Sequence, residues 1–144
     1  MEQAVNSINY YKMKAKHLYE TAQLLVAQAP AGTYTIPEEE HELIKLPGVG
    51  EKTAKVIQYV LYKKPVIAVD THVHRVANRL GIVHTKQPLQ TSKEIESRIP
   101  KKRKLDAHHA LILFGRYYCK AVKPKCELCA LKSICEFYHQ QLHK

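Results

Sequence analysis

Four cysteines near the C-terminal end are the residues whose types and spacing most clearly predict chemistry. They are the only cysteines in the chain, they follow the pattern C-x6-C-x2-C-x5-C, and they are Cys119, Cys126, Cys129 and Cys135. Four soft thiolates this close in sequence can surround one metal centre, either zinc or an iron–sulfur cluster. Zinc ribbons usually pair two short C-x2–4-C knuckles, so the wider loops favour the bulkier cluster. Two disulfides are the structural alternative, although nothing in the sequence indicates an oxidising compartment.

A glycine-containing turn is the second feature, and its sequence is Leu46-Pro47-Gly48-Val49-Gly50. Two glycines permit positive φ and the close approach of another backbone. The N–H groups of such a turn, together with the N-terminus of a following helix, can bind one phosphate. An ordinary tight turn between helices is the alternative. Beside a basic surplus, the pattern favours contact with a DNA or RNA backbone.

Two further residues could carry out chemistry on a bound substrate, and they are Lys52 and Asp70. A lysine attacks carbon as the neutral amine, which a positive helix end and a basic surface both favour. The alternative for Lys52 is a surface contact with phosphate. Asp70 is expected to cap a helix, and a carboxylate at such a position can also act as a base or hold a developing cation. The sequence leaves both roles of Asp70 open.

The elements that must position these residues are expected to be helices, so the predicted fold class is all-α. Good helix formers fill 4–29, and Pro37 followed by three glutamates is typical of a helix start. Thr91-Ser92-Lys93-Glu94 fits a capping box, and Asp106 can cap an apolar helix that leads into the cysteines. Residues 66–69 fit a short strand or an extended lead into a helix. The remaining helices are expected over 51–62, 72–80 and from the capping box to about 99.

Composition limits the class of protein and its partners. With 144 residues, 45% of them hydrophobic, the chain can form one compact domain or two small lobes, which excludes wholesale disorder. No apolar run approaches the roughly 18–20 residues that span a bilayer, so no membrane partner is expected. Residues 81–144 hold 13 basic and 5 acidic side chains, a net charge of +8. A solvated basic face is the plain explanation, and nucleic acid is the leading specific partner.

Together these residues resemble the endonuclease III family of helix–hairpin–helix DNA glycosylases. The matching stretches are LPGVGEKTA (46–54), IAVDTHVHRVANRL (67–80), HHALILFGRYYC (108–119), the four-cysteine loop and, more loosely, NYYKMKAKHL (9–18). LPGVG alone is common, but the motifs in this order and spacing are highly specific. The resemblance extends over nearly the whole chain.

The resemblance implies a two-lobed helix–hairpin–helix DNA glycosylase fold. Residues 1–64 would form part of the helical lobe, with the helix–hairpin–helix motif at about 38–62, and residues 65–144 the cluster lobe. A [4Fe-4S] cluster would be bound by the four cysteines of the loop 119–135. Lys52 would be the nucleophile and Asp70 its catalytic partner, one from each lobe. The implied DNA contacts are Leu46, Pro47, Gly48, Val49, Gly50, Lys52 and Thr53. Tyr10 occupies the position of a side chain that fills the gap left by a flipped base, although a helical tyrosine is more often in the core.

The implied activity is base excision repair of duplex DNA with oxidised pyrimidines or abasic sites. A damaged base is flipped out, Lys52 attacks C1′ and displaces it, and a Schiff base then permits β-elimination of the 3′ phosphate. This describes a bifunctional DNA glycosylase and abasic-site lyase, expected in the cytoplasm at the nucleoid. One alternative is a truncated, catalytically inactive DNA-binding paralogue. Another is a fragment that folds only with a complementary chain.

Family members usually carry several helices before the point that matches Met1. The resemblance therefore implies a partial helical lobe, without the polar residues that line the damaged-base pocket in the family. An apolar stripe through Leu24 and Leu25 is expected to be exposed unless a partner chain or a dimer covers it.

Overall fold

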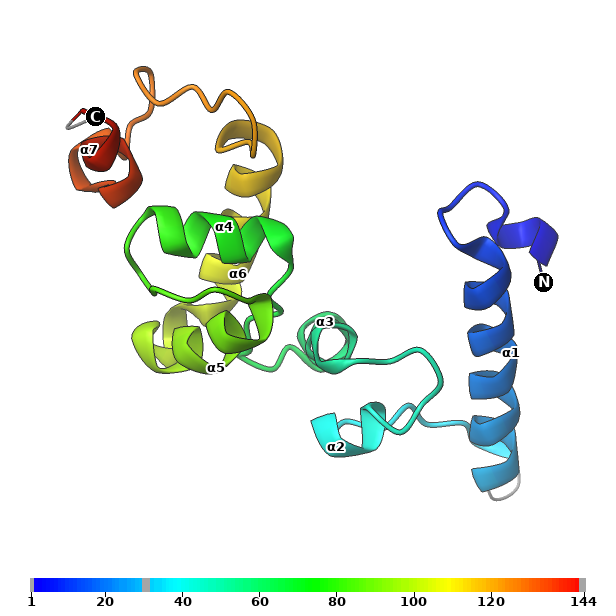
Figure 1. The fold of residues 1–144 in the computed structure, drawn as a ribbon. Coiled ribbons are helices and arrows are strands. Elements are labelled where there is room, and N and C mark those ends of the chain that lie inside the picture. Colours follow the sequence, from blue (N-terminus) through cyan, green and yellow to red (C-terminus); the bar gives the residue numbers. More distant parts are fainter. Residues whose placement is uncertain (1, 30–31, 143–144) are drawn as a thin grey trace. The chain divides into compact units, whose positions relative to one another are not determined.

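The computed structural model describes residues 2–29 and 32–142, and every regular element in these two ranges is helical (Figure 1). The predicted all-α class is therefore confirmed. The chain divides into two compact units, Met1–Gln58 and Tyr59–Lys144. The division into lobes at 64/65 stays a prediction. No helix in the described part of the chain is both long and apolar enough to cross a membrane.

The first unit contains a short 3-10 helix and the helices that flank the glycine turn. Its elements are η1 (Glu2–Val5), α1 (Tyr11–Gln28), α2 (Glu40–Leu43) and α3 (Glu51–Tyr62), whose last turn enters the second unit. The single helix expected over 4–29 is wrong at its start. Tyr10 has φ 58°, a left-handed conformation that interrupts the helix, so α1 begins one residue later. The helix expected from Pro37 is also shorter, because Glu39 is extended.

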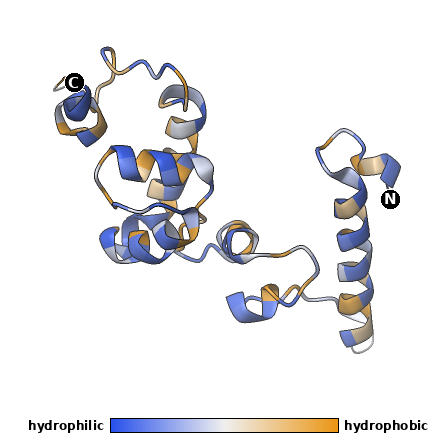
Figure 2. Ribbon diagram, viewed as in Figure 1, coloured by the Kyte–Doolittle hydropathy of each residue, from blue (hydrophilic) through white to orange (hydrophobic). Residues whose placement is uncertain are grey.

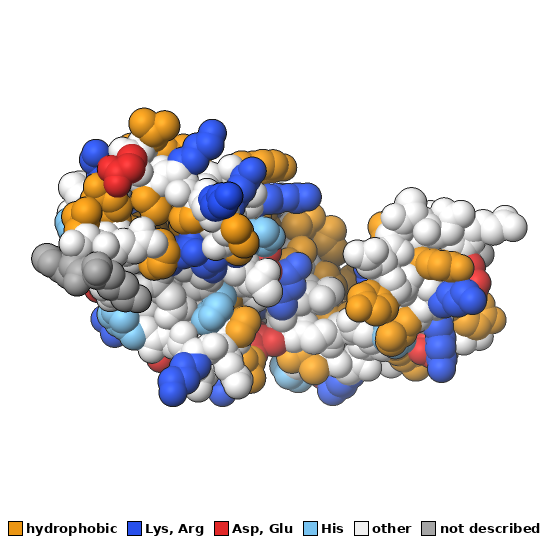
Figure 3. Space-filling model, turned by 45° about the horizontal axis from the view of Figure 1, so that its top comes forward, with side chains coloured by type: hydrophobic (Ala, Val, Ile, Leu, Met, Phe, Trp, Pro, Cys, Tyr) orange, Lys and Arg blue, Asp and Glu red, His pale blue; other side chains and the backbone are white. Residues whose placement is uncertain are grey.

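A small core holds the turn to its flanking helices. Its buried members are Leu43, Leu46 and Ala54, and Leu25, Val49 and Ile57 pack against them. Most of α1 lies outside this core, because Ala15 is its one buried residue. Leu24 is 40% exposed, whereas Leu25 is partly buried. The expected exposure is therefore confirmed for Leu24, and hydrophobic positions recur along α1 in Figure 2 and reach the surface of the first unit in Figure 3.

The second unit packs its helices around α4 (Thr71–Arg79). The others are α5 (Pro88–Arg98), η3 (Lys101–Arg103), α6 (Lys104–Leu113), the π-helical turn η4 (Phe114–Tyr118), η5 (Lys132–Ile134) and α7 (Glu136–Leu142). Residues 66–69 are extended and form no strand, so they are the lead into α4. Val73 and Val76 of α4 are fully buried against Ile95 of α5 and Leu111 of α6. This core fixes α4 and thereby the direction of its polar side chains.

Two helix starts in this unit differ from the expected ones. The capping box at Thr91 is wrong, because α5 already begins at Pro88 and the Thr91 hydroxyl donates to the carbonyl of Gln87 at 3.3 Å. Proline at the first helical position accounts for the earlier start. Asp106 is not a cap, because α6 begins at Lys104 after η3. Its carboxylate lies in the first turn, where the helix dipole still favours it.

The π-helical turn η4 connects α6 to the first cysteine. The Cys119 amide donates to the carbonyl of Phe114 at 2.7 Å, across five residues. A Cβ atom on Gly115 would lie 3.0 Å from the His72 backbone oxygen and from the Val76 side chain, so glycine permits η4 to pack closely on α4. Arg75 donates to the Gly115 carbonyl at 2.7 Å and reinforces this contact.

Candidate functional site

The hairpin between α2 and α3 presents backbone donors at its surface. The first bond of α3 runs from the Ala54 amide to the Gly50 carbonyl at 2.9 Å. The three amides before Ala54 therefore have no acceptor within the helix, as at every helix start. Lys52 and Thr53 are exposed beside them, whereas Leu46 belongs to the core at 8% exposure. The turn thus combines a buried anchor with amides that the helix itself leaves without an acceptor.

The two glycines of the turn serve different purposes. Gly48 has φ +74°, and a Cβ atom there would overlap the ring of His17 on α1. It is needed for both the turn and its packing. Gly50 does not have positive φ, and a Cβ atom at this position would meet nothing within 4 Å. Nothing within the described residues requires glycine at position 50.

The two lysines at the start of α3 are in opposite situations. Lys55 is buried, and its ammonium lies 3.4 Å from the Glu51 carboxylate. Lys52 is exposed, and its amine makes no hydrogen bond or ion pair with any residue that the structure describes. Lys55 therefore has a structural role, and Lys52 keeps its amine available at the helix start.

Asp70 caps α4, as expected. Its Oδ1 atom accepts from the His72 amide at 2.9 Å and from the Val73 amide at 2.8 Å. Oδ2 has no hydrogen-bond partner among the described residues. The half-buried carboxylate thus uses one oxygen for the fold and leaves the other available.

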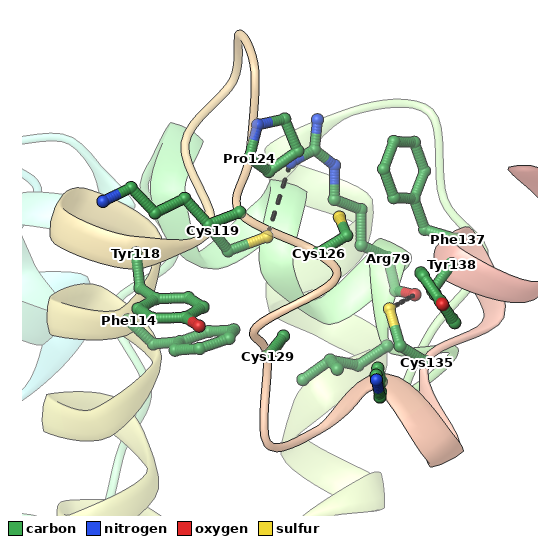
Figure 4. A pocket seen from close by; sticks show the side chains of 13 residues that line it. Arg79, Phe114, Tyr118, Cys119, Pro124, Cys126, Cys129, Cys135, Phe137 and Tyr138 are labelled. Atoms are coloured by element: carbon green, nitrogen blue, oxygen red, sulfur yellow. Dashed lines mark hydrogen bonds between the residues drawn. The ribbon is translucent and has the colours of Figure 1, made fainter.

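The four cysteines line one pocket of the second unit (Figure 4). None of the four forms a disulfide; Cys135 is buried and the others are half-buried. Burial raises the pKa of the Cys126 thiol, and the negative charges of Cys119 and Cys135 raise it further, while Arg79 opposes them. All four thiols line the same pocket, so the donor set fits a thiolate-bound metal centre.

An arginine and several aromatic side chains also line this pocket, and sequence reasoning did not single them out. Arg79 donates to the Cys119 sulfur at 3.4 Å and lies over the Phe137 ring, 4.3 Å from its centroid. The rings of Phe114 and Tyr118 stack at 5.4 Å on the other side of the cysteines (Figure 4). One signal in the sequence could have pointed to Arg79. Arg75 and Arg79 are four residues apart on α4 and therefore lie on the same face of that helix.

Basic side chains also lie on the loop between the first two cysteines. Lys120, Lys123 and Lys125 are all exposed. They give this loop a positive surface suited to phosphate, and a solvated loop is the alternative.

The predicted residues fall into the two units. The hairpin and Lys52 belong to Met1–Gln58, and Asp70 and the cysteines belong to Tyr59–Lys144. Within the second unit the structure brings the four cysteines together. In the described ranges, no group of three or more histidine, cysteine, aspartate or glutamate side chains is arranged around a single metal ion.

Comparisons with known proteins agree with this helical architecture. A family model described as HhH-GPD superfamily base excision DNA repair protein matches residues 1–101. Endonuclease III of Rickettsia felis is 41% identical over 142 residues, which are 99% of this chain and 65% of that protein. Endonuclease III of Bacillus subtilis is 42% identical over 94% of this chain and 61% of its own length. The chain thus spans less than two thirds of the length of these curated relatives.

Solved structures of endonuclease III also match this chain. A non-covalent endonuclease III–DNA complex matches with a TM-score of 0.88 and 38% identity, covering 99% of this chain and 66% of that one. A trapped covalent endonuclease III–DNA intermediate matches with a TM-score of 0.87 and 39% identity, covering 98% of this chain and 65% of that one.

Proposed function

This chain belongs to the HhH-GPD superfamily of base excision DNA repair proteins, and from that premise we propose that it is a DNA glycosylase with abasic-site lyase activity. Its substrate would be duplex DNA that carries an oxidised pyrimidine or an abasic site. The free amine of Lys52, at the start of α3 directly after the hairpin, is the observation that carries the proposal.

Lys52 would act as the nucleophile. Its amine attacks C1′ of the damaged nucleotide, a carbon–nitrogen bond forms, and the glycosidic bond breaks as the base leaves with a proton. The sugar ring opens to give a Schiff base with the lysine. Loss of a proton from C2′ then expels the 3′ phosphate, and water releases the amine. Oδ2 of Asp70, which the cap leaves unused, would serve as the catalytic partner in moving protons or holding positive charge.

The hairpin would hold the DNA backbone. The amides at the start of α3, which have no acceptor within the helix, and the positive end of that helix suit one phosphate. Gly50 supports this role, because a glycine that the protein itself does not need is explained by the close approach of another molecule. Val49, Lys52 and Thr53 would add neighbouring contacts, and Leu46 would act through the turn that it anchors.

Tyr10 would fill the gap that the flipped base leaves in the stack. It is 79% exposed at the residue before α1, so it is not part of the core. An exposed aromatic ring can stack on bases.

The cysteine pocket would hold a [4Fe-4S] cluster through Cys119, Cys126, Cys129 and Cys135. These four thiols line one pocket, and their wide spacing along the chain suits a polynuclear centre better than one zinc ion. Such a cluster supplies cross-links within a loop and, in some proteins, electron transfer. The role proposed here is the structural one.

The two hairpin glycines provide a matched pair of substitutions. Gly50→Ala is expected to change the free energy of unfolding by less than about 0.5 kcal/mol but to weaken duplex DNA binding roughly 5–10-fold, because one backbone–phosphate contact is lost. Gly48→Ala is expected to cost about 1–3 kcal/mol of stability, because alanine disfavours its φ and overlaps His17. Denaturant unfolding and fluorescence anisotropy with labelled duplex measure the two effects. Equal DNA affinity for wild type and Gly50→Ala would contradict the phosphate contact.

Borohydride trapping on duplex DNA with an abasic site tests the proposed activity. Reduction of the Schiff base should leave a covalent protein–DNA adduct, and a duplex with an oxidised pyrimidine should lose the base and be nicked. Folded protein that binds the duplex with salt-dependent affinity but forms no adduct would instead indicate the catalytically inactive DNA-binding paralogue.

A further inference from the structure

We propose that Arg79 is the positioning residue of the cysteine pocket, which fastens both ends of the cysteine loop to α4 and donates a hydrogen bond to the Cys119 sulfur. The proposal rests on the cluster proposed above. It concerns a side chain that is not a ligand and that reaches the loop from the last turn of α4.

The guanidinium of Arg79 holds the start of the loop at three points. Nη1 donates to the Cys119 sulfur at 3.4 Å and to the carbonyl of Lys120 at 2.8 Å. Nη2 donates to the carbonyl of Ala121 at 3.1 Å. Three consecutive residues are therefore fixed by one planar group, a geometry that arginine can provide and lysine cannot.

The same residue also holds the end of the loop. The Arg79 guanidinium lies over the ring of Phe137 in α7, two residues after Cys135, and this contact does not depend on the protonation of the cysteines (Figure 4). The Cys135 thiol also donates to the Arg79 carbonyl at 3.3 Å, a bond that Cys135 gives up when it binds a cluster as the thiolate. Both ends of the cysteine loop are thus joined to one residue, 40 positions before Cys119 and 56 positions before Cys135, which is itself fixed by the buried valines of α4.

Two consequences follow for a bound cluster. The loop is held in place by protein contacts, so less conformational freedom must be lost when the cluster binds. A hydrogen bond to a ligand sulfur, with a positive charge beside it, stabilises the more negative reduced form. Loss of Arg79 should therefore loosen the cluster and make its potential more negative.

Arg79→Gln, Arg79→Lys and Arg116→Gln test this inference. Arg116 is exposed, and its only described partner is the Tyr117 ring, so its replacement removes the same charge close to the pocket without touching a cysteine. Visible absorbance under air would measure the rate of cluster loss, and voltammetry would measure the reduction potential of the cluster. Circular dichroism would show whether each variant is folded. Hydrogen–deuterium exchange of the peptide 119–129 in iron-free protein would follow the loop alone.

Arg79→Gln is expected to lose its cluster roughly 10–100-fold faster than wild type, with a more negative potential and faster exchange in the loop. For Arg79→Lys, the rate of cluster loss and the rate of exchange should lie between those of Arg79→Gln and wild type. Arg116→Gln should match wild type in both. Cluster loss and exchange within twofold of wild type for folded Arg79→Gln would overturn the inference. If wild type takes up no iron, the proposed cluster fails, and the exchange experiment still decides whether Arg79 fastens the loop.

Discussion

Lys52→Ala is expected to abolish both the borohydride adduct and strand cleavage, reducing the rate by roughly 10³-fold or more, while duplex binding falls only a few-fold. The covalent step needs the amine itself, and no water-based route replaces it at comparable rate. Binding depends on many phosphate contacts, of which this side chain supplies at most one. Single-turnover cleavage and anisotropy on the same abasic duplex measure the two effects.

Lys52→Arg separates the nucleophile from its charge. Arginine keeps the positive charge, but its guanidinium stays protonated and cannot form a Schiff base. We expect binding close to wild type and no adduct. The matched control is Lys12→Ala, which removes one lysine from α1 of the same unit and should leave both readouts unchanged. An adduct from Lys52→Ala would show that another amine is the nucleophile, and loss of duplex binding would assign Lys52 a structural role.

Asp70→Asn is expected to reduce turnover about 10²–10⁴-fold with almost no change in stability. Asparagine caps a helix as well as aspartate does, so its side-chain oxygen can still accept from the amides of His72 and Val73. It cannot take up a proton or carry a negative charge, and these are the properties that the chemistry would use at Oδ2.

Asp70→Ala provides the comparison for this prediction. It removes the cap as well as the charge and should therefore lower the free energy of unfolding by about 1 kcal/mol. Denaturant unfolding measures the stability of both variants, and single-turnover base release measures their activity. If Asp70→Asn were as active as wild type, the carboxylate would be a cap and nothing more.

Local signals predicted those parts of the molecule in which neighbouring residues decide the structure. Asp70, which follows an apolar run, predicted the start of α4, and the two closely spaced glycines Gly48 and Gly50 predicted the turn before α3. The start of α5 was missed because the Thr91 hydroxyl, which is suited to a cap, bonds to the Gln87 carbonyl within the helix and to His74. The capping-box residues are present in the sequence, but Thr91 is buried inside the second unit, and its hydroxyl therefore bonds to neighbouring residues and does not cap the helix.

Only part of the cysteine pocket could be predicted from the sequence. The four cysteines could be recognised from their spacing, because the ligands lie close together in the chain. Arg79 could not, because its partners lie some 40 residues away and a charged residue on a helix usually faces solvent. The contrast between Lys52 and Lys55 is similar, since only the packing of α3 shows which of the two is buried.

The π-helical turn η4 makes the direction of the first cysteine depend on the length of the segment before it. The bond that closes this turn joins residues five apart, whereas an α-helical bond joins residues four apart. The turn therefore contains one extra residue, as if one residue had been inserted into an α-helix. Each helical residue advances the chain by about 100° around the axis. Deletion of one exposed residue there, such as Arg116, would turn Cys119 by that angle and away from the other thiols. This segment should therefore tolerate substitutions at its surface but neither insertions nor deletions.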